Sequence, residues 1–408
     1  MDVRELHKLC IDSYTGTGGY LDGKYLHEFS KEEDYAERLL NSYYENYVIG
    51  MIASATQPVF GDKVQRKYDT PMYREFCNNV DMVGTPLTSW LLNVASYHTL
   101  LGNVFIIMDN VKEPIQNLQE AMAKRDYPFL YYKLPRDVQS VKLDRFGKVV
   151  SLSFALPDIE IEGTKYKQTR TVIDGVQIDT YKDGDETKQV GDTVTGVNII
   201  MTGSEALPIP PFLSICQISK AIYNMDSEQR DLERAQAFNI LQIPSDMPEV
   251  AQTLGSKNLL YVGSDATRDA KYISPDANIL QTLGVSSDRM TVRLKDQARN
   301  LGIRVVEKHY KSGTALSLDY APSYAVYANM SILFEDIEGK IRDMFSLATK
   351  TTDSTDITYN RDYAPSPDQL TADYELLVAA MDTDYGEDRN TKIIDSAYTK
   401  LSKITGLE

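Results

Sequence analysis

Two long helical patterns with a short strand-rich segment between them constrain the fold of this chain most. In the first, over residues 214–238, apolar side chains recur at intervals of three and four: Ile215, Ile218, Ile222, Met225, Leu232 and Ala235. The second begins at Ser286 or Ser287, either of which can cap a helix, and continues to about Tyr310. Neither apolar stripe is wide enough for a core of its own, and such narrow stripes are typical of helices that pack against one another. We therefore expect both helices to pack against copies of the same chain.

The segment between the helices, residues 240–279, has a different pattern. It contains short apolar runs separated by prolines and glycines: Ile240-Leu241, Leu259-Leu-Tyr-Val262 and Tyr272-Ile273. Short runs bounded by turn residues predict a small β-containing module inserted between the two helices. Upstream, Pro208, Pro210 and Pro211 exclude helix and fix an abrupt start for the first helix.

The second helix reverses the charge of the chain. The net charge is −16, yet residues 286–311 carry seven basic side chains against three acidic ones. The simplest interpretation is a solvated helix face. The alternatives are ion pairing with the acidic face of a neighbouring copy, through Asp226, Glu228 or Asp231, or contact with a polyanion such as DNA. The candidate residues lie about one turn apart: Arg289, Arg293, Lys295 and Arg299.

The N-terminal half alternates helices with a strand. Ser30-Lys-Glu-Glu33 is a capping-box pattern that predicts a helix through Tyr35, Leu39, Tyr43 and Val48, ended by Pro58. A second helix is predicted from Pro86 to a C-cap at Gly102, followed by a buried strand at 104–108.

Residues 127–201 change to short alternating runs with turns at Asp144–Gly147, Asp174-Gly175 and Asp183-Gly184, which predict an antiparallel meander. The tail combines a short strand, Ile357-Thr-Tyr359, with helices predicted at 367–381 and 388–405.

Composition sets the outer limits. The chain has 408 residues and 42% apolar residues, enough for two or three domains with a sizeable core. No apolar run approaches the ~20 residues that cross a bilayer, and the N-terminus lacks a signal-peptide layout, so we expect no membrane association. Cys10, Cys77 and Cys216 are few and far apart, which favours reduced thiols. The 27 tyrosines against one tryptophan suit large interfaces with polar rims.

The motifs of common catalytic sites are absent from the sequence. There is no H-E-x-x-H, no G-x-S-x-G and no G-x-x-x-x-G-K-[ST]. Gly16-Thr-Gly-Gly19 follows a helical pattern rather than a strand, and Asp382–Asp388 lacks the closing glutamate of a calcium loop. A carboxylate pair for glycoside hydrolysis cannot be located from sequence. We expect a protein that is not an enzyme and binds no cofactor or metal.

Several motifs, taken in order, are similar to those of one family. They are Tyr35-Ala-Glu-Arg38, Tyr44-Glu-Asn-Tyr-Val48, Gln57-Pro-Val-Phe60, Asn79-Val-Asp81, Thr85-Pro-Leu87, Gly102 with Phe105-Ile-Ile-Met-Asp109, Lys311-Ser-Gly-Thr-Ala-Leu-Ser-Leu318, and Asp356-Ile-Thr-Tyr-Asn360 with Asp362-Tyr363. In this order they resemble the portal proteins of tailed bacteriophages, the ring-shaped head–tail connectors, from about Tyr20 to Leu401.

The resemblance implies an α+β subunit with a defined order of parts. These are a mixed wing (1–213), a stem helix (214–238), a clip (239–284), a second stem helix (285–311), a tunnel loop with a kinked wing helix (312–350), a return strand (351–366) and a small helical crown (367–408). The implied tunnel-loop residues are Ser317, Leu318, Asp319 and Tyr320, and the implied docking residues of the clip are Gly255, Lys257, Asp265 and Arg268.

The resemblance also implies a function and partners. About twelve copies would close into a ring at one capsid vertex, in contact with the major capsid protein. Double-stranded DNA would pass through the channel without sequence specificity during packaging and ejection. The clip would bind terminase and then the head–tail adaptor proteins. Such a protein would assemble in the host bacterial cytoplasm and reside in the virion.

The chain departs from the family in two respects. It is short, so its crown is reduced, and no strongly basic loop lies between Leu318 and Tyr324. An acidic conduit nonetheless suits sliding DNA, because every phosphate bound by Lys or Arg adds affinity. Two other classes stay open: an acidic component of another large assembly, such as a baseplate or scaffold, and a hydrolase with a carboxylate pair.

Overall fold

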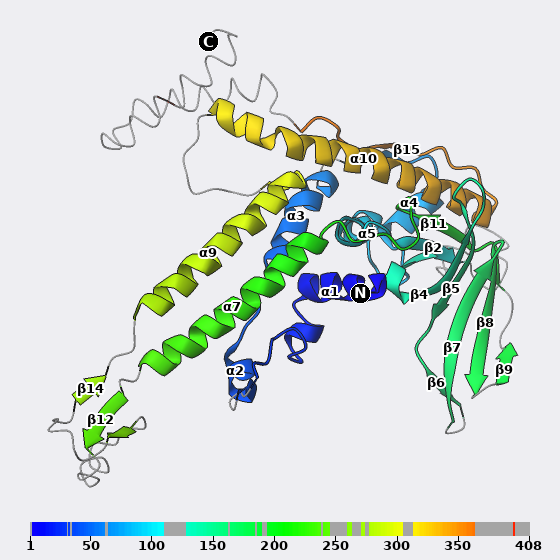
Figure 1. The fold of residues 1–408 in the computed structure, drawn as a ribbon. Helices are drawn as coiled ribbons and strands as arrows, with labels where there is room; N and C mark the ends of the chain where they lie inside the picture. Colours follow the sequence, from blue (N-terminus) through cyan, green and yellow to red (C-terminus); the bar gives the residue numbers. More distant parts are fainter. Residues whose placement is uncertain are drawn as a thin grey trace. The chain divides into compact units, whose positions relative to one another are not determined.

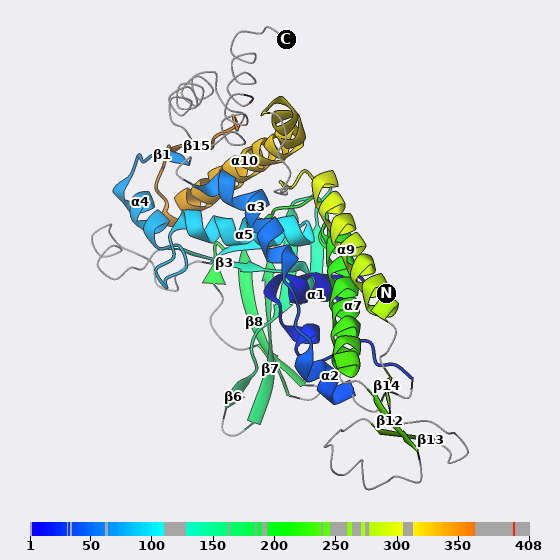
Figure 2. The same ribbon diagram turned by 90° about the vertical axis from the view of Figure 1, so that its left-hand side faces the viewer.

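A computed structural model describes residues 2–30, 32, 35–61, 64–109, 128–161, 164–183, 186–189, 194–237, 240–244, 259–262, 271–273, 277–304, 313–363 and 395. The chain forms two compact units (Figures 1 and 2). Unit 1 comprises Met1–Ile11, Ile49–Leu213 and Ala298–Glu408, and unit 2 comprises Asp12–Val48 and Ser214–Gln297. Residues 12–48 therefore group with the helix pair and not with the predicted wing.

The centre of unit 1 is a three-stranded antiparallel sheet in which β2 (Phe105–Asp109) lies between β11 (Asn198–Met201) and β3 (Phe129–Lys133). All five residues of β2 are buried. Because consecutive side chains of a strand point to opposite faces, Ile106 and Met108 join one core and Phe105 and Ile107 join another. This two-sided burial explains the uninterrupted apolar run that predicts a strand here.

Helices cover one face of this sheet. They are α3 (Tyr47–Phe60), α4 (Pro71–Asn78), α5 (Leu87–Leu101) and α10 (Gly313–Thr349), with Phe76, Leu91, Phe334 and Phe345 fully buried among them. The predicted C-cap is confirmed: Gly102 has a φ of 83° and donates its N–H to the His98 carbonyl at 2.7 Å. Among the described residues, no helix combines the length and apolarity needed to cross a bilayer.

A seven-stranded antiparallel sheet supplies the second core, with Leu152, Phe154 and Val172 packed beside Phe105 and Ile107. Its strands are β4 (Val138–Leu143), β5 (Val149–Ala155), β6 (Ile159–Ile161), β7 (Thr164–Ile173), β8 (Val176–Asp183), β9 (Glu186–Gln189) and β10 (Val194–Thr195). The predicted meander is confirmed. The hairpin turn at Asp174-Gly175 has the expected geometry, because both residues have positive φ, 50° and 79°. Gly184, of the turn predicted at Asp183-Gly184, lies outside the described residues.

The first predicted helix is wrong in two respects. It is divided into α2 (Tyr35–Asn41) and α3, and Pro58 lies inside α3 instead of ending it. Proline lacks the N–H that would bond the carbonyl four residues earlier, that of Ser54. The Tyr327 hydroxyl donates to this carbonyl at 3.0 Å, so the acceptor is satisfied from α10. Glu33 lies outside the described residues, and Glu32 accepts the Phe29 N–H at 3.0 Å.

The short strand predicted at 357–359 is present as β15 (Asp356–Thr358), which pairs antiparallel with β1 (Gln65–Lys67). Beside it lies a buried ion pair in which Arg66 donates through Nε and Nη2 to the two carboxylate oxygens of Glu338, at 2.5 and 2.9 Å. Tyr359 donates to the same carboxylate at 2.7 Å, and Arg66 Nη1 donates to Thr88 Oγ1 at 2.8 Å. The network joins β1, α5, α10 and the residue after β15. The helices predicted at 367–381 and 388–405 lie outside the described residues, apart from Asp395.

Glu338→Gln tests the weight of this network. Glu338 is fully buried, so the variant leaves the Arg66 charge in the core without its counter-charge. We expect a loss of roughly 3–5 kcal/mol in the free energy of unfolding, measured by urea titration. Glu335→Gln is the matched control, since the partner of Glu335, Arg361, is 56% exposed. Equal losses of unfolding free energy in Glu338→Gln and Glu335→Gln would contradict the stabilising role of the buried ion pair.

His98 predicts a pH dependence of stability. Its Nδ1 lies 2.9 Å from Thr202 Oγ1, which itself accepts the Val104 N–H at 2.9 Å, so the Thr202 hydroxyl is placed to donate to a neutral imidazole. Burial lowers the pKa of His98 from 6.5 to about 4. The unfolded chain therefore binds this proton below about pH 6.5 and the folded protein only below about pH 4. As the pH decreases from 6.5 to 4, the free energy of unfolding should fall by on the order of 3 kcal/mol in total.

The measurement is the urea midpoint as a function of pH in the native protein and in His98→Gln. In His98→Gln, most of the decrease of the urea midpoint between pH 6.5 and 4 should be absent. His27→Gln, at an exposed position, should leave the profile unchanged. An unaltered slope in His98→Gln would contradict the prediction.

Candidate assembly site on the helix pair

The helix pair of unit 2 has the predicted inserted sheet. Helix α7 (Leu213–Ala237) leads into β12 (Ile240–Pro244), β13 (Leu259–Val262) and β14 (Lys271–Ile273), and α9 (Ala277–Asn300) follows. Strand β12 is central, parallel to β13 and antiparallel to β14. Figure 1 shows α7 and α9 side by side, with the sheet where one ends and the other begins, so the two helices are antiparallel.

The N-terminal segment of unit 2, residues 12–48, packs along α7. Tyr223 donates its hydroxyl to the Tyr20 carbonyl at 3.2 Å, with their rings 5.2 Å apart edge to face. At the next residue of α7, the amide of Asn224 donates to the Tyr25 carbonyl at 2.9 Å and accepts the His27 N–H at 2.7 Å. These bonds connect backbone groups of the segment to the side of α7.

A cluster of tyrosines forms the core of this contact. The rings of Tyr20 and Tyr44 stack with centroids 3.8 Å apart. Tyr44 donates to the Ser13 carbonyl at 3.0 Å, and the hydroxyls of Ser13 and Tyr20 lie 2.9 Å apart. Burial raises the pKa of both Tyr20 and Tyr44, so both phenols stay protonated and able to donate. The tyrosine-rich composition therefore contributes to an interior as well as to surfaces.

The loop Gly16–Gly19 has a structural role in this cluster. It follows α1 (Val3–Thr15) and forms the short helix η1 (Gly18–Tyr20). Asp12 accepts the Gly19 N–H at 3.1 Å and the Tyr25 hydroxyl at 2.8 Å. Gly18 has a φ of 57°, and a Cβ there would lie 2.5 Å from the Asp12 carboxylate. The glycines thus permit close approach of the loop to Asp12.

The part of the segment that contains α2 contacts the C-terminal half of α7 through charged and polar side chains. Arg38 donates to Ser227 Oγ at 3.4 Å and pairs with Glu32 at 2.5 Å, which lowers the pKa of the Glu32 carboxyl. The guanidinium of Arg230 lies 3.6 Å from the centre of the Tyr43 ring. Arg234 pairs with Glu37 on α2.

These contacts correct the expectation that α7 lacks a core of its own. Ile215 is fully buried and Ile222 is 2% exposed within a single chain. Residues 12–48 cover one side of α7, and sequence analysis missed this role. The only signal in the sequence is the run of tyrosines at positions 20, 25, 35, 43 and 44.

The start and end of the second helix are also corrected. Helix α9 begins at Ala277, so Ser286 and Ser287 lie inside it and do not cap it. The clip boundary at 284 therefore falls within a helix. Ser287 bonds the Asp226 carboxylate of the same chain at 2.7 Å. One of the acids expected to pair with the basic residues of a neighbouring copy therefore already has a partner in its own chain. The helix ends at Asn300, before Gly302 with a φ of 71°, instead of near Tyr310.

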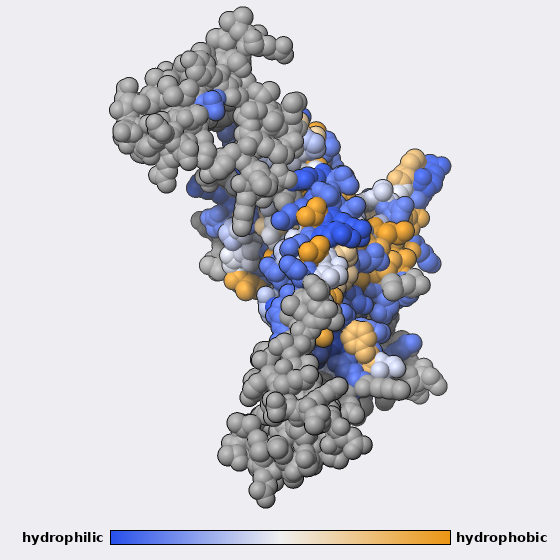
Figure 3. Space-filling model, turned by 60° about the vertical axis from the view of Figure 1, so that its left-hand side comes forward, coloured by the Kyte–Doolittle hydropathy of each residue, from blue (hydrophilic) through white to orange (hydrophobic). Residues whose placement is uncertain are grey.

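The four basic candidates lie on exposed positions of α9, and Arg293 and Lys295, two residues apart, project to different sides of the helix. Arg289, Arg293, Lys295 and Arg299 are all exposed, whereas Leu294 and Ala298 on the inner face are fully buried. The outward face of α9 carries two apolar side chains one heptad apart, Val285 and Val292, which are 56% and 55% exposed. On the side of the molecule drawn in Figure 3, hydrophobic residues likewise occur in separate small groups among hydrophilic ones. The outward face of α9 thus alternates valine with charge.

The other site predictions have different outcomes. The tunnel-loop assignment is wrong as secondary structure, because Ser317, Leu318, Asp319 and Tyr320 lie in α10 and the helix continues through Pro322. Arg304 stacks on the Tyr320 ring at 4.3 Å. The clip candidates Gly255, Lys257, Asp265 and Arg268 lie outside the described residues.

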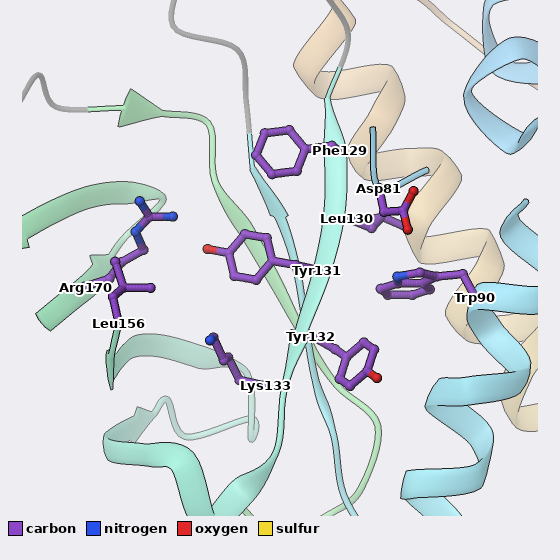
Figure 4. Close-up of a pocket in the computed structure, with 9 residues that line it drawn as sticks. All are labelled: Asp81, Trp90, Phe129, Leu130, Tyr131, Tyr132, Lys133, Leu156 and Arg170. Atoms are coloured by element: carbon purple, nitrogen blue, oxygen red, sulfur yellow. The ribbon is translucent and has the colours of Figure 1, made fainter. Parts of the chain in front are cut away.

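A pocket of about 360 Å³ lies at β3 in unit 1. In Figure 4, Tyr131 and Lys133 point toward Arg170 on one side of the strand, and Tyr132 points toward Trp90 on the other. Arg170 pairs with Asp179 at 2.8 Å and with Asp109 at 3.3 Å. The charged lining groups thus serve the sheet, and the pocket offers no carboxylate pair for hydrolysis.

In the part of the chain that the structure describes, no group of three or more His, Cys, Asp or Glu side chains is arranged to hold a metal ion.

Comparisons with known proteins give likenesses in structure and none in sequence. No family model matches the chain. No curated protein matches it in sequence either. A solved structure described as "Neck of empty GTA particle computed with C6 symmetry" is similar at a TM-score of 0.37 and 11% identity, covering 90% of this chain and 94% of that one. Assignment of function therefore depends on the helix pair and its surfaces.

Asn224→Ala tests the attachment of residues 12–48 to α7. The variant leaves the Tyr25 carbonyl and the His27 N–H without their partner, so we expect a loss of roughly 2 kcal/mol in unfolding free energy and faster proteolysis within 12–48. Asn41→Ala is the control, because the exposed Asn41 amide bonds only within α2, to the Glu37 carbonyl at 2.9 Å. Proteolysis at the native rate in Asn224→Ala would contradict this role.

Proposed function

We propose that this chain is the portal subunit of a tailed-bacteriophage-type particle, a ring at one capsid vertex through which double-stranded DNA enters and leaves. The observation that carries the proposal is the antiparallel pair α7 and α9 with a small sheet inserted between them. At a rise of 1.5 Å per residue, the 25 residues of α7 span roughly 37 Å. Such a pair is a rod able to form part of a channel wall.

The order of the remaining elements also supports the proposal. An α/β unit precedes the rod, and the long helix α10 and the strand β15 follow it and return to the same unit. The buried contacts among Arg66, Glu338 and Tyr359 join the part before the rod to the part after it. The rod and its inserted sheet are therefore a single insertion in the sequence of the α/β unit.

The charge distribution suits a conduit. A chain of net charge −16 repels DNA over most of its surface, and the exposed cations of α9 are exceptions. In this proposal the inserted sheet binds terminase during packaging and adaptor proteins afterwards. The major capsid protein surrounds the ring in the virion. The portal subunit performs no catalysis itself.

Ring closure follows from the kind of contact. Identical chains that join through two different surfaces form either a closed ring or an open filament. A conduit needs the ring, and about twelve copies would enclose the channel, as the resemblance implies.

The test is negative-stain electron microscopy of the purified full chain, together with native mass spectrometry. The expected result is rings with a central hole and a single subunit number near twelve. Irregular oligomers would favour an acidic component of another assembly, and compact monomers at high concentration would favour an unrelated activity. Either result would contradict the proposed function.

A further inference from the structure

We propose that the outward face of α9 in one copy packs against the α2 side of unit 2 in the next copy, with Val285 against Leu40 and Tyr43, and Arg289 opposite Glu28. This inference rests on the proposed ring and specifies its contact surface. Both surfaces belong to unit 2, and each is exposed in the single chain.

The first surface is the α9 face. Val285 and Val292 are more than half exposed although valine gains free energy when buried. Arginines flank them at 289 and 293. An exposed apolar stripe within a charged surface is typical of a contact with another protein. A surface that only contacts sliding DNA has no need of valine, so these residues favour ion pairing with a neighbour over a lining of the channel.

The second surface is the α2 side. Leu40 is 86% exposed and Tyr43 is 59% exposed, although Arg230 already stacks on the Tyr43 ring. Glu28 and Asp231 are exposed nearby and supply acids to this side, where the cation Arg234 is paired with Glu37. Arg38, which lies between them, is held by Glu32 and Ser227 of its own chain. The α2 side thus combines apolar area with acids, which complements valine with arginine.

The register of the rod places these groups at matching heights. Ser287 bonds Asp226, so in the antiparallel pair residue 285 lies level with residue 228, and residue 289 with residue 224. Ser227 bonds Arg38 on α2, which puts Val285 near the height of Leu40. Asn224 bonds His27, which puts Arg289 near the height of Glu28. Rotation about an axis along the rods preserves height, so these pairs meet between neighbouring copies.

The two surfaces lie on different sides of α7, as a ring requires. Helix α9 contacts α7 through Asp226, and residues 12–48 contact it through Tyr223, Asn224 and Ser227. In Figures 1 and 2, α9 and α2 lie to either side of α7. One copy therefore presents the α9 face at one flank and the α2 side at the other, and the contact is of the head-to-tail kind that closes into rings.

Val285→Asp is the first test. It places a carboxylate in the proposed contact but adds only a charge to an exposed position of the single chain. The protein concentration at which half the chains are assembled should rise at least tenfold, measured by sedimentation velocity. Val83→Asp, at an 88% exposed position in unit 1, is the control and should assemble as the native chain does. Circular dichroism checks that both variants fold.

A mixing experiment distinguishes this contact from general loss of assembly. Arg289→Glu alone places a glutamate opposite Glu28, and Glu28→Arg alone places an arginine opposite Arg289. Each variant should assemble at least tenfold less well, while an equimolar mixture of the two variants restores rings in which they alternate. The doubly substituted chain should assemble as the native chain does.

The failures of the two proposals are distinguishable. Native chains that form no ring would overturn the proposed function together with this contact. Native rings that persist unchanged in Val285→Asp, or charge variants that do not recover on mixing, would overturn this contact and leave the ring in place.

Discussion

The mutual burial of helix α7 and residues 12–48 determines what the rest of unit 2 can do. Tyr20, Tyr44 and Tyr223 supply apolar area, and their hydroxyls bond backbone carbonyls or the Ser13 hydroxyl, so a largely aromatic contact has few unpaired polar groups. Asn224 adds two bonds to the same segment. Helix α7 is therefore complete within its own chain. Its remaining exposed side chains can specify which neighbour binds.

Burial of α7 within its own chain changes how assembly can be driven. If both helices lacked a core, the single chain would be unstable and assembly would be driven by wholesale burial. Instead, α9 buries Leu294 and Ala298 on its inner face and presents valine and arginine on its outer face. Contacts of this mixed kind depend on matched charge and register more than on area.

Local patterns in the sequence predicted the elements well where one physical cause dominated. Gly102 ends α5 because a left-handed residue is needed there, and the two-sided burial of β2 produced an uninterrupted apolar run. The three short strands between α7 and α9 follow from apolar runs between prolines and glycines. The prediction failed where a distant residue compensated for a local signal. Pro58 does not end α3, because Tyr327 satisfies the Ser54 carbonyl. Ser287 does not cap α9, because the helix already begins at Ala277, and the Ser287 hydroxyl bonds Asp226 instead. The pairing of residues 12–48 with α7 depends on contacts about 200 positions apart, which no local period encodes.

In the proposed ring, neighbouring copies join through the outer face of α9 and the exposed side of α2. Disulfide cross-linking measures this contact directly in a chain carrying Leu40→Cys and Val285→Cys, since the native Cys10, Cys77 and Cys216 are buried. Mild oxidation of assembled protein should give a ladder of covalent multimers up to the full ring on a non-reducing gel, and neither single variant should give a ladder. Assembled rings that yield only single chains after oxidation would contradict the claim.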